Sequence, residues 1–231
     1  MRLSAEPWED LRAYTSTYLR EEVFAEAIVR RLEVFASFLD LAATKVTEEI
    51  NYESLASDLG TNPRTTRNFF DVLEDTLIGF RLPPFRLSKQ RKAVSRSKFY
   101  LFDLGVTNAL LQRREVPPRS DAFGRCFEHF LLLELRAYLS YRRRDERLTY
   151  WRTHSGFEVD CLVGKTLAME FKATDLVQER HLKGLKALRE EGVIKKFLVV
   201  SQDRNARTVD GITILPWQDF LDKLWNDELI P

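Results

Sequence analysis

The sequence predicts a protein of the α+β or α/β class, with a helical module in its N-terminal half and a mixed β-sheet flanked by helices in its C-terminal half. Apolar residues recur every three or four positions between about 8 and 43, which is typical of one face of an amphipathic helix. Short apolar and alternating runs between 148 and 214 indicate strands. Between these regions, Pro117 and Pro118 interrupt regular structure and mark the best domain boundary.

Composition limits the classes of function. A chain of 231 residues with 44% hydrophobic residues can form one large core or two modest ones. Its 36 Lys and Arg nearly cancel its 35 Asp and Glu, so any case for nucleic-acid binding depends on local clustering. Two cysteines in apolar runs and no long uncharged segment predict a cytoplasmic chain with free thiols and no membrane association.

A helix-turn-helix pattern follows the first helical region. Residues 51–60 form a short helical pattern closed by Gly60, since glycine adopts the left-handed conformation at a helix end. Thr61 or Asn62 can cap a second helix, and Pro63 suits its first turn. This second helix, from about 64 to 76, presents Arg64 and Arg67 outward, where they can contact DNA. A purely structural helical hairpin is the alternative.

A basic stretch comes next, between residues 81 and 102. It holds seven cations and no acidic residue, and its apolar ends predict a β-hairpin of the kind that forms the wing of a winged-helix module. A solvated loop and a docking surface for an acidic protein are the alternatives. We expect the domains to be a helical lead-in at 1–44, a winged-helix-like module at 45–118 and the sheet domain at 119–231. Phosphate contacts are expected from Arg64, Arg67, Lys89, Arg91 and Lys92.

The C-terminal half predicts the order helix, three strands, helix, strand. The expected ranges are 123–144, 148–153, 157–163, 167–173, 181–191 and 196–201, followed by a strand at 212–214 and a helix at 217–225. This order is that of the core of the PD-(D/E)xK nucleases, a restriction-endonuclease-like fold. Gly164-Lys165-Thr166 lacks the first glycine of a P-loop, so no nucleotide site is expected.

Charged side chains gather on the second and third of these strands. Because side chains alternate between the faces of a strand, Glu158 and Asp160 should share a face with Glu170 and Lys172. Carboxylates gathered in this way favour a hard cation such as Mg²⁺ or Mn²⁺, and Lys172 can hold a phosphate oxygen or orient a water molecule beside it. The alternative is a solvent-exposed face on which Lys172 forms a salt bridge with Asp160 or Glu158.

The chain resembles the C-terminal portion of prokaryotic AAA-type ATP-binding proteins, a region of unknown function. The segments that carry the resemblance are Tyr18–Glu22, Leu73–Ile78, Lys98–Val106, Gly124–His129, Tyr150–Thr153, Gly156–Asp160 and Glu170–Lys172. The resemblance implies a P-loop ATPase, a winged helix and a PD-(D/E)xK-like domain, of which the ATPase has no counterpart in this sequence. It implies that Glu128 is the acid of the helix, Asp160 a metal ligand, and Glu170 and Lys172 the acidic-x-Lys pair.

These observations predict a DNA-binding, metal-dependent phosphodiesterase module. Its catalytic residues would be Glu128, Asp160, Glu170 and Lys172, with Asp160 and Glu170 binding Mg²⁺ or Mn²⁺. DNA is the expected substrate, and a P-loop ATPase domain or subunit is the expected protein partner. The alternative is a non-catalytic DNA-binding or regulatory module that acts with an ATPase.

Overall fold

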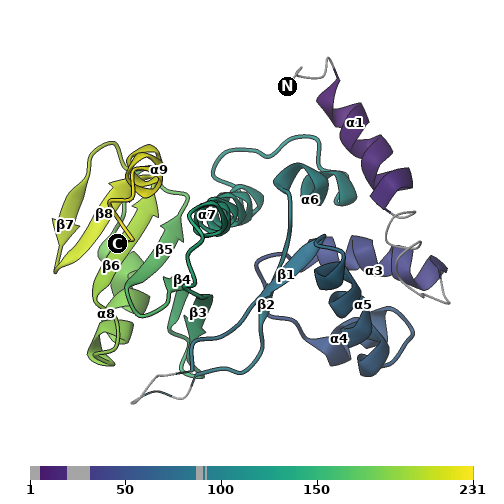
Figure 1. Cartoon of the computed structure of the whole chain (residues 1–231), viewed down its shortest axis with the longest axis horizontal. Helices are drawn as coiled ribbons and strands as arrows, with labels where there is room; N and C mark the ends of the chain where they lie inside the picture. The colour runs from purple at the N-terminus through teal and green to yellow at the C-terminus, as the bar shows by residue number, and fades with distance from the viewer. Residues whose placement is uncertain (1–5, 20–31, 87–90, 92, 231) are drawn as a thin grey trace. The chain divides into compact units, whose positions relative to one another are not determined.

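The computed structural model describes residues 6–19, 32–86, 91 and 93–230 (Figure 1). Contacts divide the chain into two units. The first unit comprises residues 1–81 and 97–116, and the second comprises residues 82–96 and 117–231. Helices occur in both units and the larger sheet in the second, so the mixed α+β class predicted from the sequence is confirmed.

The first unit is mainly helical. Within the helical region predicted from 8 to 43, α1 leads into a π-helical turn, η1, and α3 is described from Leu32; residues 20–31 lie outside the described part of the chain. Strands β1 and β2 pair as a two-stranded sheet. The elements are α1 (Pro7–Ala13), η1 (Tyr14–Tyr18), α3 (Leu32–Thr44), α4 (Tyr52–Asp58), α5 (Pro63–Asp75), β1 (Gly79–Leu82), β2 (Lys98–Leu101) and α6 (Leu104–Leu110).

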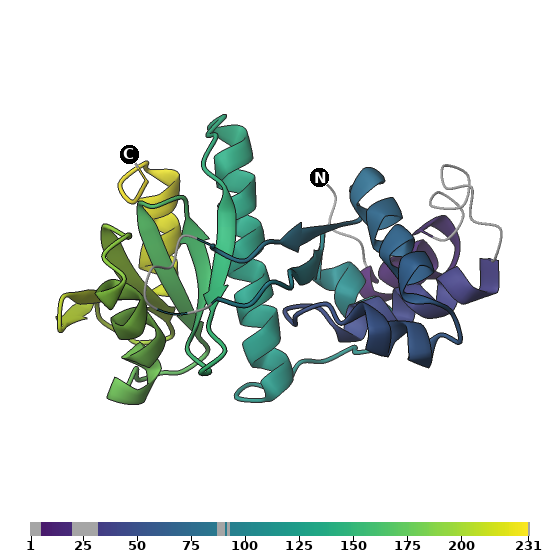
Figure 2. The ribbon, with the colours of Figure 1, turned by 90° about the horizontal axis from the view of Figure 1, so that it is seen from below.

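The predicted helix-turn-helix is formed by α4 and α5, which lie side by side within this unit (Figure 2). Gly60 has a φ of 59° in the turn, a conformation that glycine adopts without a steric penalty. The side chain of Asn62 accepts a hydrogen bond of 2.9 Å from the backbone N–H of Thr65, which caps α5. Pro63 follows the cap in the first turn of α5, so the start of the second helix is set locally.

Aromatic rings hold this helix pair against α3 and β2. Phe38 of α3 contacts Phe69 and Phe70 of α5 with ring centroids 5.2 and 4.9 Å apart. Phe70 in turn meets Phe99 of β2 edge to face at 4.8 Å. These are the separations at which aromatic pairs attract beyond their burial, so α5 has a fixed orientation in the unit.

The basic stretch does more than close a hairpin between β1 and β2. Its middle part, residues 82–96, belongs to the second unit. The backbone N–H of Phe85 donates to the carbonyl of Tyr150 at 2.7 Å, and the N–H of Val94 donates to the carbonyl of Arg152 at 2.9 Å. Both arms therefore satisfy backbone groups of a strand at the edge of the larger sheet, and edge strands require such cover.

The second unit contains a six-stranded sheet with the order β3-β4-β5-β6-β8-β7. Strands β5, β6 and β8 are parallel neighbours, and the remaining pairs are antiparallel. The short edge strand β7 was not predicted from the sequence. The elements are α7 (Asp121–Tyr141), β3 (Leu148–Arg152), β4 (Glu158–Val163), β5 (Leu167–Lys172), η2 (Glu179–Leu182), α8 (Lys183–Glu190), β6 (Lys196–Ser201), β7 (Arg207–Val209), β8 (Ile212–Pro216) and α9 (Trp217–Trp225).

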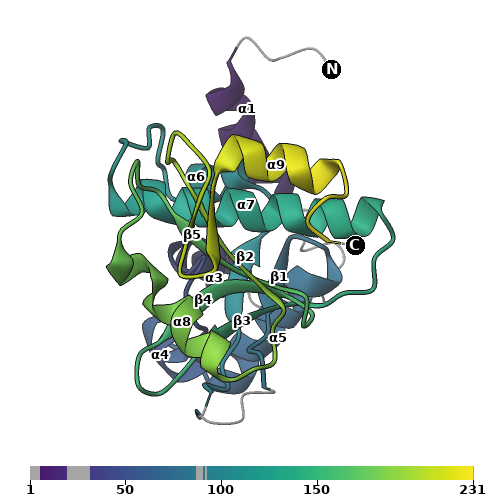
Figure 3. The ribbon, with the colours of Figure 1, turned by 90° about the vertical axis from the view of Figure 1, so that its left-hand side faces the viewer.

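Helices cover both faces of this sheet. Figure 3 shows α7 and α9 together along one face and α8 along the other. The central strands are consequently buried on both sides, so β4 and β5 are almost entirely inaccessible to solvent. The face of this hairpin that carries Asp160 and Glu170 is therefore covered and does not face solvent. No helix among the described residues is long and apolar enough to cross a membrane.

Replacing either of two glycines in the helices of this unit by alanine should change the stability in opposite directions. A Cβ added at Gly184 of α8 would lie 1.8 Å from the carbonyl oxygen of Glu158, whereas one at Gly124 of α7 would meet no atom within 4 Å. Gly184→Ala should lower the free energy of unfolding by roughly 1–3 kcal/mol, because the helix must move off β4. Gly124→Ala should raise it by up to about 1 kcal/mol through helix propensity. Denaturant titration measures both, and equal effects would contradict the packing described.

Candidate functional site

Asp160 lies where β4 and β5 separate. The paired residues of this ladder run from Val163–Leu167 to Cys161–Met169. Beyond them, the backbone N–H of Phe171 donates to Oδ2 of Asp160 at 2.8 Å. The carboxylate thus accepts the hydrogen bond that the diverging strand no longer supplies, which fixes the position of Asp160 beside β5.

Lys172 stands beside two buried carboxylates. Its Nζ lies 2.6 Å from Oε1 of Glu170 and 3.8 Å from Oδ2 of Asp160. Asp160 is 6% exposed and Glu170 7% exposed, although the side chain of Lys172 is 33% exposed. The ion pair of Lys172 with Asp160 that the alternative expected is therefore present, but this side of the hairpin is not exposed to solvent, because α8 and its neighbours cover it.

The second oxygen of Glu170, Oε2, is buried and has no hydrogen-bond partner. Burial and the neighbouring charge of Asp160 raise the pKa of Glu170 to about 8. Burial alone would lower the pKa of Lys172, but the charges of Asp160 and Glu170 outweigh it and raise that pKa. The two shifts describe one cluster in which Lys172 stays cationic, Asp160 supplies its counter-charge, and Glu170 is the group that burial disfavours in its ionised form.

A cleft of about 810 Å³ opens beside this cluster within the second unit. Its lining includes Lys172 at the end of β5, Glu128 on α7, and residues 173–176 in the loop that follows β5. The charge of Glu128 contributes to the raised pKa of Lys172. Among the described residues, no three His, Cys, Asp or Glu side chains are placed to share a metal ion. Glu128 therefore lies near Lys172 without forming a three-carboxylate cluster with Asp160 and Glu170.

The cleft also contains three arginines and a histidine that were not predicted from the sequence to belong to the site. Arg119 and Arg125 line it at the start of α7, and Arg180 and His181 line it in η2. Their place follows from the sheet. The carboxyl ends of parallel strands lie at one edge of a sheet, where ligands bind in open α/β folds, and Lys172 and Ser201 are register partners at that edge in β5 and β6. Residues just after a parallel strand were the signal available in the sequence.

The predicted DNA contacts have different surroundings. Arg64 and Arg67 are exposed on α5, and the guanidinium of Arg67 lies 4.4 Å from the ring centroid of Tyr52. Arg91 instead forms ion pairs with Glu190 and, at 3.3 Å, with Glu191. Lys89 and Lys92 lie outside the described residues. Arg64 and Arg67 belong to the first unit and Arg91 to the second.

The expectation that the basic stretch lacks counter-charges is wrong. Arg81 pairs with Glu74 and, at 2.7 Å, with Asp71, while the side chain of Arg91 is only 24% exposed in its pairs with glutamates. The acids lie on α5 and at the end of α8, outside residues 81–102, so the absence of acidic residues within that range did not reveal them. These ion pairs neutralise part of the positive charge of the basic stretch within the protein.

The raised pKa of Glu170 predicts a stability that depends on pH. A carboxyl whose pKa is higher in the folded state stabilises the fold at low pH, and that contribution is lost as the pH rises toward about 8. Glu170→Gln removes the ionisation, so its melting temperature in a chelator should exceed that of the parent by an amount that grows between about pH 5 and pH 9. Thermal melting at several pH values tests this. A constant difference would show that folding does not disfavour the ionised carboxyl.

Each half of the chain is similar to a different family of known proteins. Residues 2–116 match a family model described as a domain of unknown function (DUF8612), and residues 123–220 match a second such model (DUF4143). Uncharacterized proteins of Mycobacterium bovis and Mycobacterium tuberculosis are 30% identical over 125 residues, which is 52% of this chain and 27% of each relative. The chain thus matches about a quarter of the length of these relatives. No solved structure matches. The chain is therefore similar to two domains of unknown function, DUF8612 in its first half and DUF4143 in its second.

Proposed function

We propose that the second unit is a metal-dependent phosphodiesterase domain of the PD-(D/E)xK type that acts on DNA. The observation that carries this proposal is the cluster in which Lys172 lies beside buried Asp160 and Glu170 at a cleft lined with arginines. Burying two carboxylates is costly unless cations compensate them. One lysine balances one of them, so a second cation would complete the charge balance.

The donor set fits Mg²⁺ or Mn²⁺. Mg²⁺ is commonly held by one or two carboxylates together with waters and substrate phosphates, and the unpartnered Oε2 of Glu170 is an available oxygen donor. Asp160 and Glu170 are the residues that would hold the ion. Such an ion lowers the pKa of a bound water and neutralises phosphate charge. Lys172, held by Glu170 but still partly exposed, can donate to a phosphate oxygen in the cleft.

We propose that the first unit delivers DNA and that an ATPase supplies the partner activity. The winged-helix assignment is supported by the capped α4–α5 pair and by the exposure of Arg64 and Arg67. The DUF4143 family is typically found with AAA ATPases, which supports a P-loop ATPase, either as a domain of a longer polypeptide or as a separate subunit. The activity of the longer relatives would then combine these parts.

A second candidate is a DNA-binding or regulatory module without catalysis. The 2.6 Å bond between Lys172 and Glu170 favours it, because a lysine paired in this way can stabilise a buried acid without any chemistry. The two candidates share the DNA contacts of α5 and differ in the metal. A metal-dependent reaction requires Asp160 and Glu170, whereas a binding module does not.

Divalent metal and DNA cleavage separate the two candidates. The parent should melt at a higher temperature in Mn²⁺ than in a chelator, since a ligand that binds only the folded state stabilises it, and it should cleave DNA in Mg²⁺ or Mn²⁺. Asp160→Asn should lose both responses and keep its stability in the chelator. Asp145→Asn, which removes an exposed carboxylate of the same unit, is the matched control. A parent that neither cleaves DNA nor responds to either metal would rule out the phosphodiesterase.

The role of α5 is tested by the salt dependence of DNA affinity. Each phosphate contact contributes about 0.9 to the slope of log affinity against log salt on duplex DNA. Arg64→Ala combined with Arg67→Ala should therefore weaken binding and lower the slope by about 1.8. The double variant Arg147→Ala, Arg204→Ala removes the same charge from exposed positions of the second unit. Equal slopes for the parent and the α5 variant would make α5 a structural helix only.

A further inference from the structure

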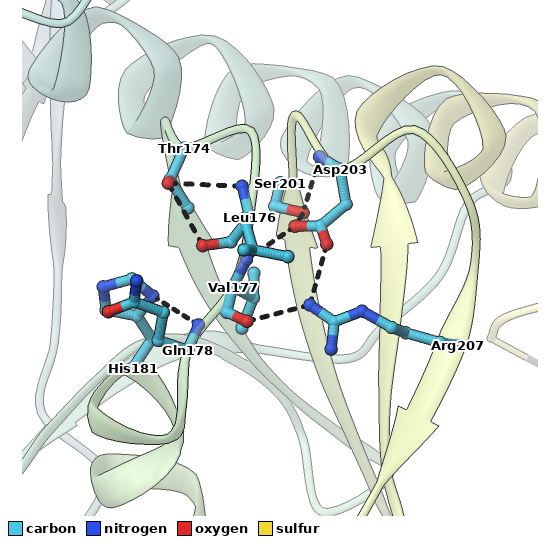
Figure 4. Close-up of polar contacts among 8 residues, drawn as sticks. All are labelled: Thr174, Leu176, Val177, Gln178, His181, Ser201, Asp203 and Arg207. Atoms are coloured by element: carbon cyan, nitrogen blue, oxygen red, sulfur yellow. Dashed lines mark hydrogen bonds and ion pairs between the residues drawn. The ribbon is translucent and has the colours of Figure 1, made fainter.

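A buried aspartate ties the loop after β5 to the end of β6 (Figure 4). Asp203 is 5% exposed. Its Oδ2 accepts hydrogen bonds from the N–H of Val177 at 2.8 Å and from the hydroxyl of Ser201 at 2.9 Å, and its Oδ1 accepts one from Arg207 at 2.8 Å. Burial alone would raise the pKa of Asp203, but these bonds outweigh it and lower that pKa. Asp203 is therefore an ionised anchor.

Arg207 completes the anchor. The Nη2 atom that bonds Asp203 also donates to the carbonyl oxygen of Val177 at 2.8 Å. Both polar backbone groups of Val177 are thereby held, while its side chain is 5% exposed among apolar residues that include those of α8. Neither Asp203 nor Arg207 is among the residues that line the cleft. They fix the loop at the residue next to the cleft-lining Gln178.

This fixed backbone sets the orientation of His181. The N–H of Gln178 donates to Nδ1 of His181 at 3.1 Å. A neutral imidazole has one acceptor nitrogen and one donor, so Nε2 carries the proton. Burial and the charges of Arg180 and Lys172 lower the pKa of His181, which favours this neutral form. The lining of the cleft therefore includes a neutral N–H donor.

The Nε–H of Arg180 is directed at Nε2 of His181, 3.2 Å away. A neutral imidazole cannot accept at both ring nitrogens. Nδ1 already accepts from the N–H of Gln178, which follows the anchored Val177, so the exposed Arg180 needs another acceptor. With the proton on Nε2, both atoms are donors, and neither can satisfy the other. An anionic oxygen that carries no hydrogen can accept from both at once. A phosphate is the ligand class that suits such a pair, because it offers several acceptor oxygens and a charge that an arginine complements.

We propose that His181 and Arg180 bind a phosphate group of the substrate, and that Asp203 and Arg207 are positioning residues that hold His181 in place. The identification of that phosphate as a DNA phosphodiester rests on the proposed function. Lys172 lines the same cleft, so one DNA strand can contact Lys172 and the His181–Arg180 pair together.

DNA affinity in a chelator tests the pair separately from catalysis. Binding of a fluorescent DNA duplex is measured by anisotropy at several salt concentrations. Arg180→Ala should weaken binding about tenfold and lower the salt slope by about 0.9. His181→Ala should also weaken binding about tenfold but leave the slope unchanged, because a neutral donor displaces no counterion. His154→Ala and Arg204→Ala, at exposed positions of the same unit, should match the parent.

The same assay can overturn the proposal. If His181→Ala binds DNA like the parent, His181 does not contact a phosphate. A flatter slope of log affinity against log salt for that variant would show a charged imidazolium instead of the neutral donor. A parent that binds DNA with these properties but neither cleaves it nor responds to Mn²⁺ would rule out the phosphodiesterase and leave the phosphate contact standing. The two failures are therefore distinguishable.

A double-mutant cycle tests positioning. Asp203→Asn removes a buried charge and can unfold the domain, so Arg207→Gln, on edge strand β7, is the main variant. It should weaken DNA binding about as much as His181→Ala, and the two changes together should add little, because they act through one contact. Arg204→Gln controls for the lost charge, and the Mn²⁺ shift should persist in Arg207→Gln. Fully additive losses, or parent-like binding by Arg207→Gln, would contradict the positioning role.

Discussion

The second unit depends on Lys172, whose ammonium group lies between two carboxylates that the sheet buries. Removing charges from water costs several kcal/mol per ion in proteins, and one lysine compensates only one carboxylate fully. The raised pKa of Glu170 is the direct result. Apolar side chains in place of these charged ones would pack beneath α8 without this cost, so the stability of the fold does not explain the cluster. Under the proposed function, a bound cation would balance the second charge.

The strand geometry explains why the cluster is open on one side. Strands β4 and β5 separate beyond Cys161 and Met169, and Asp160 takes over the hydrogen bond of the Phe171 N–H. This separation occurs at the edge where β5 and β6 end, so the loops that follow these parallel strands meet there. One loop forms part of the cleft, and the other carries Asp203. A single feature of the sheet therefore places the acids, the cleft and the anchor of its loop.

Cations of the basic stretch pair with acids that lie outside it in the sequence. Arg91 pairs with glutamates at the end of α8, and Arg81 pairs with acids on α5. These ion pairs neutralise part of the positive charge of the basic stretch, in a chain whose total charge is nearly zero. The arginines on α5 and those of the cleft keep exposed side chains, and each lies within a unit of its own. DNA contact at either place can be tested separately.

The sequence by itself determined the local features. Asn62, Pro63 and Gly60 act within one or two helical turns, so the α4–α5 pair was predictable, as were the strands at 158–163, 167–172 and 196–201 and the shared face of Asp160, Glu170 and Lys172. Tertiary structure decided the rest. Whether that face meets solvent depends on α8, which packs against it from a later part of the chain. The ion pairs of Arg91 with Glu190 and Glu191 and the hydrogen bond of Asp203 to Val177 join segments distant in the sequence, and such contacts leave no periodic signal in the sequence.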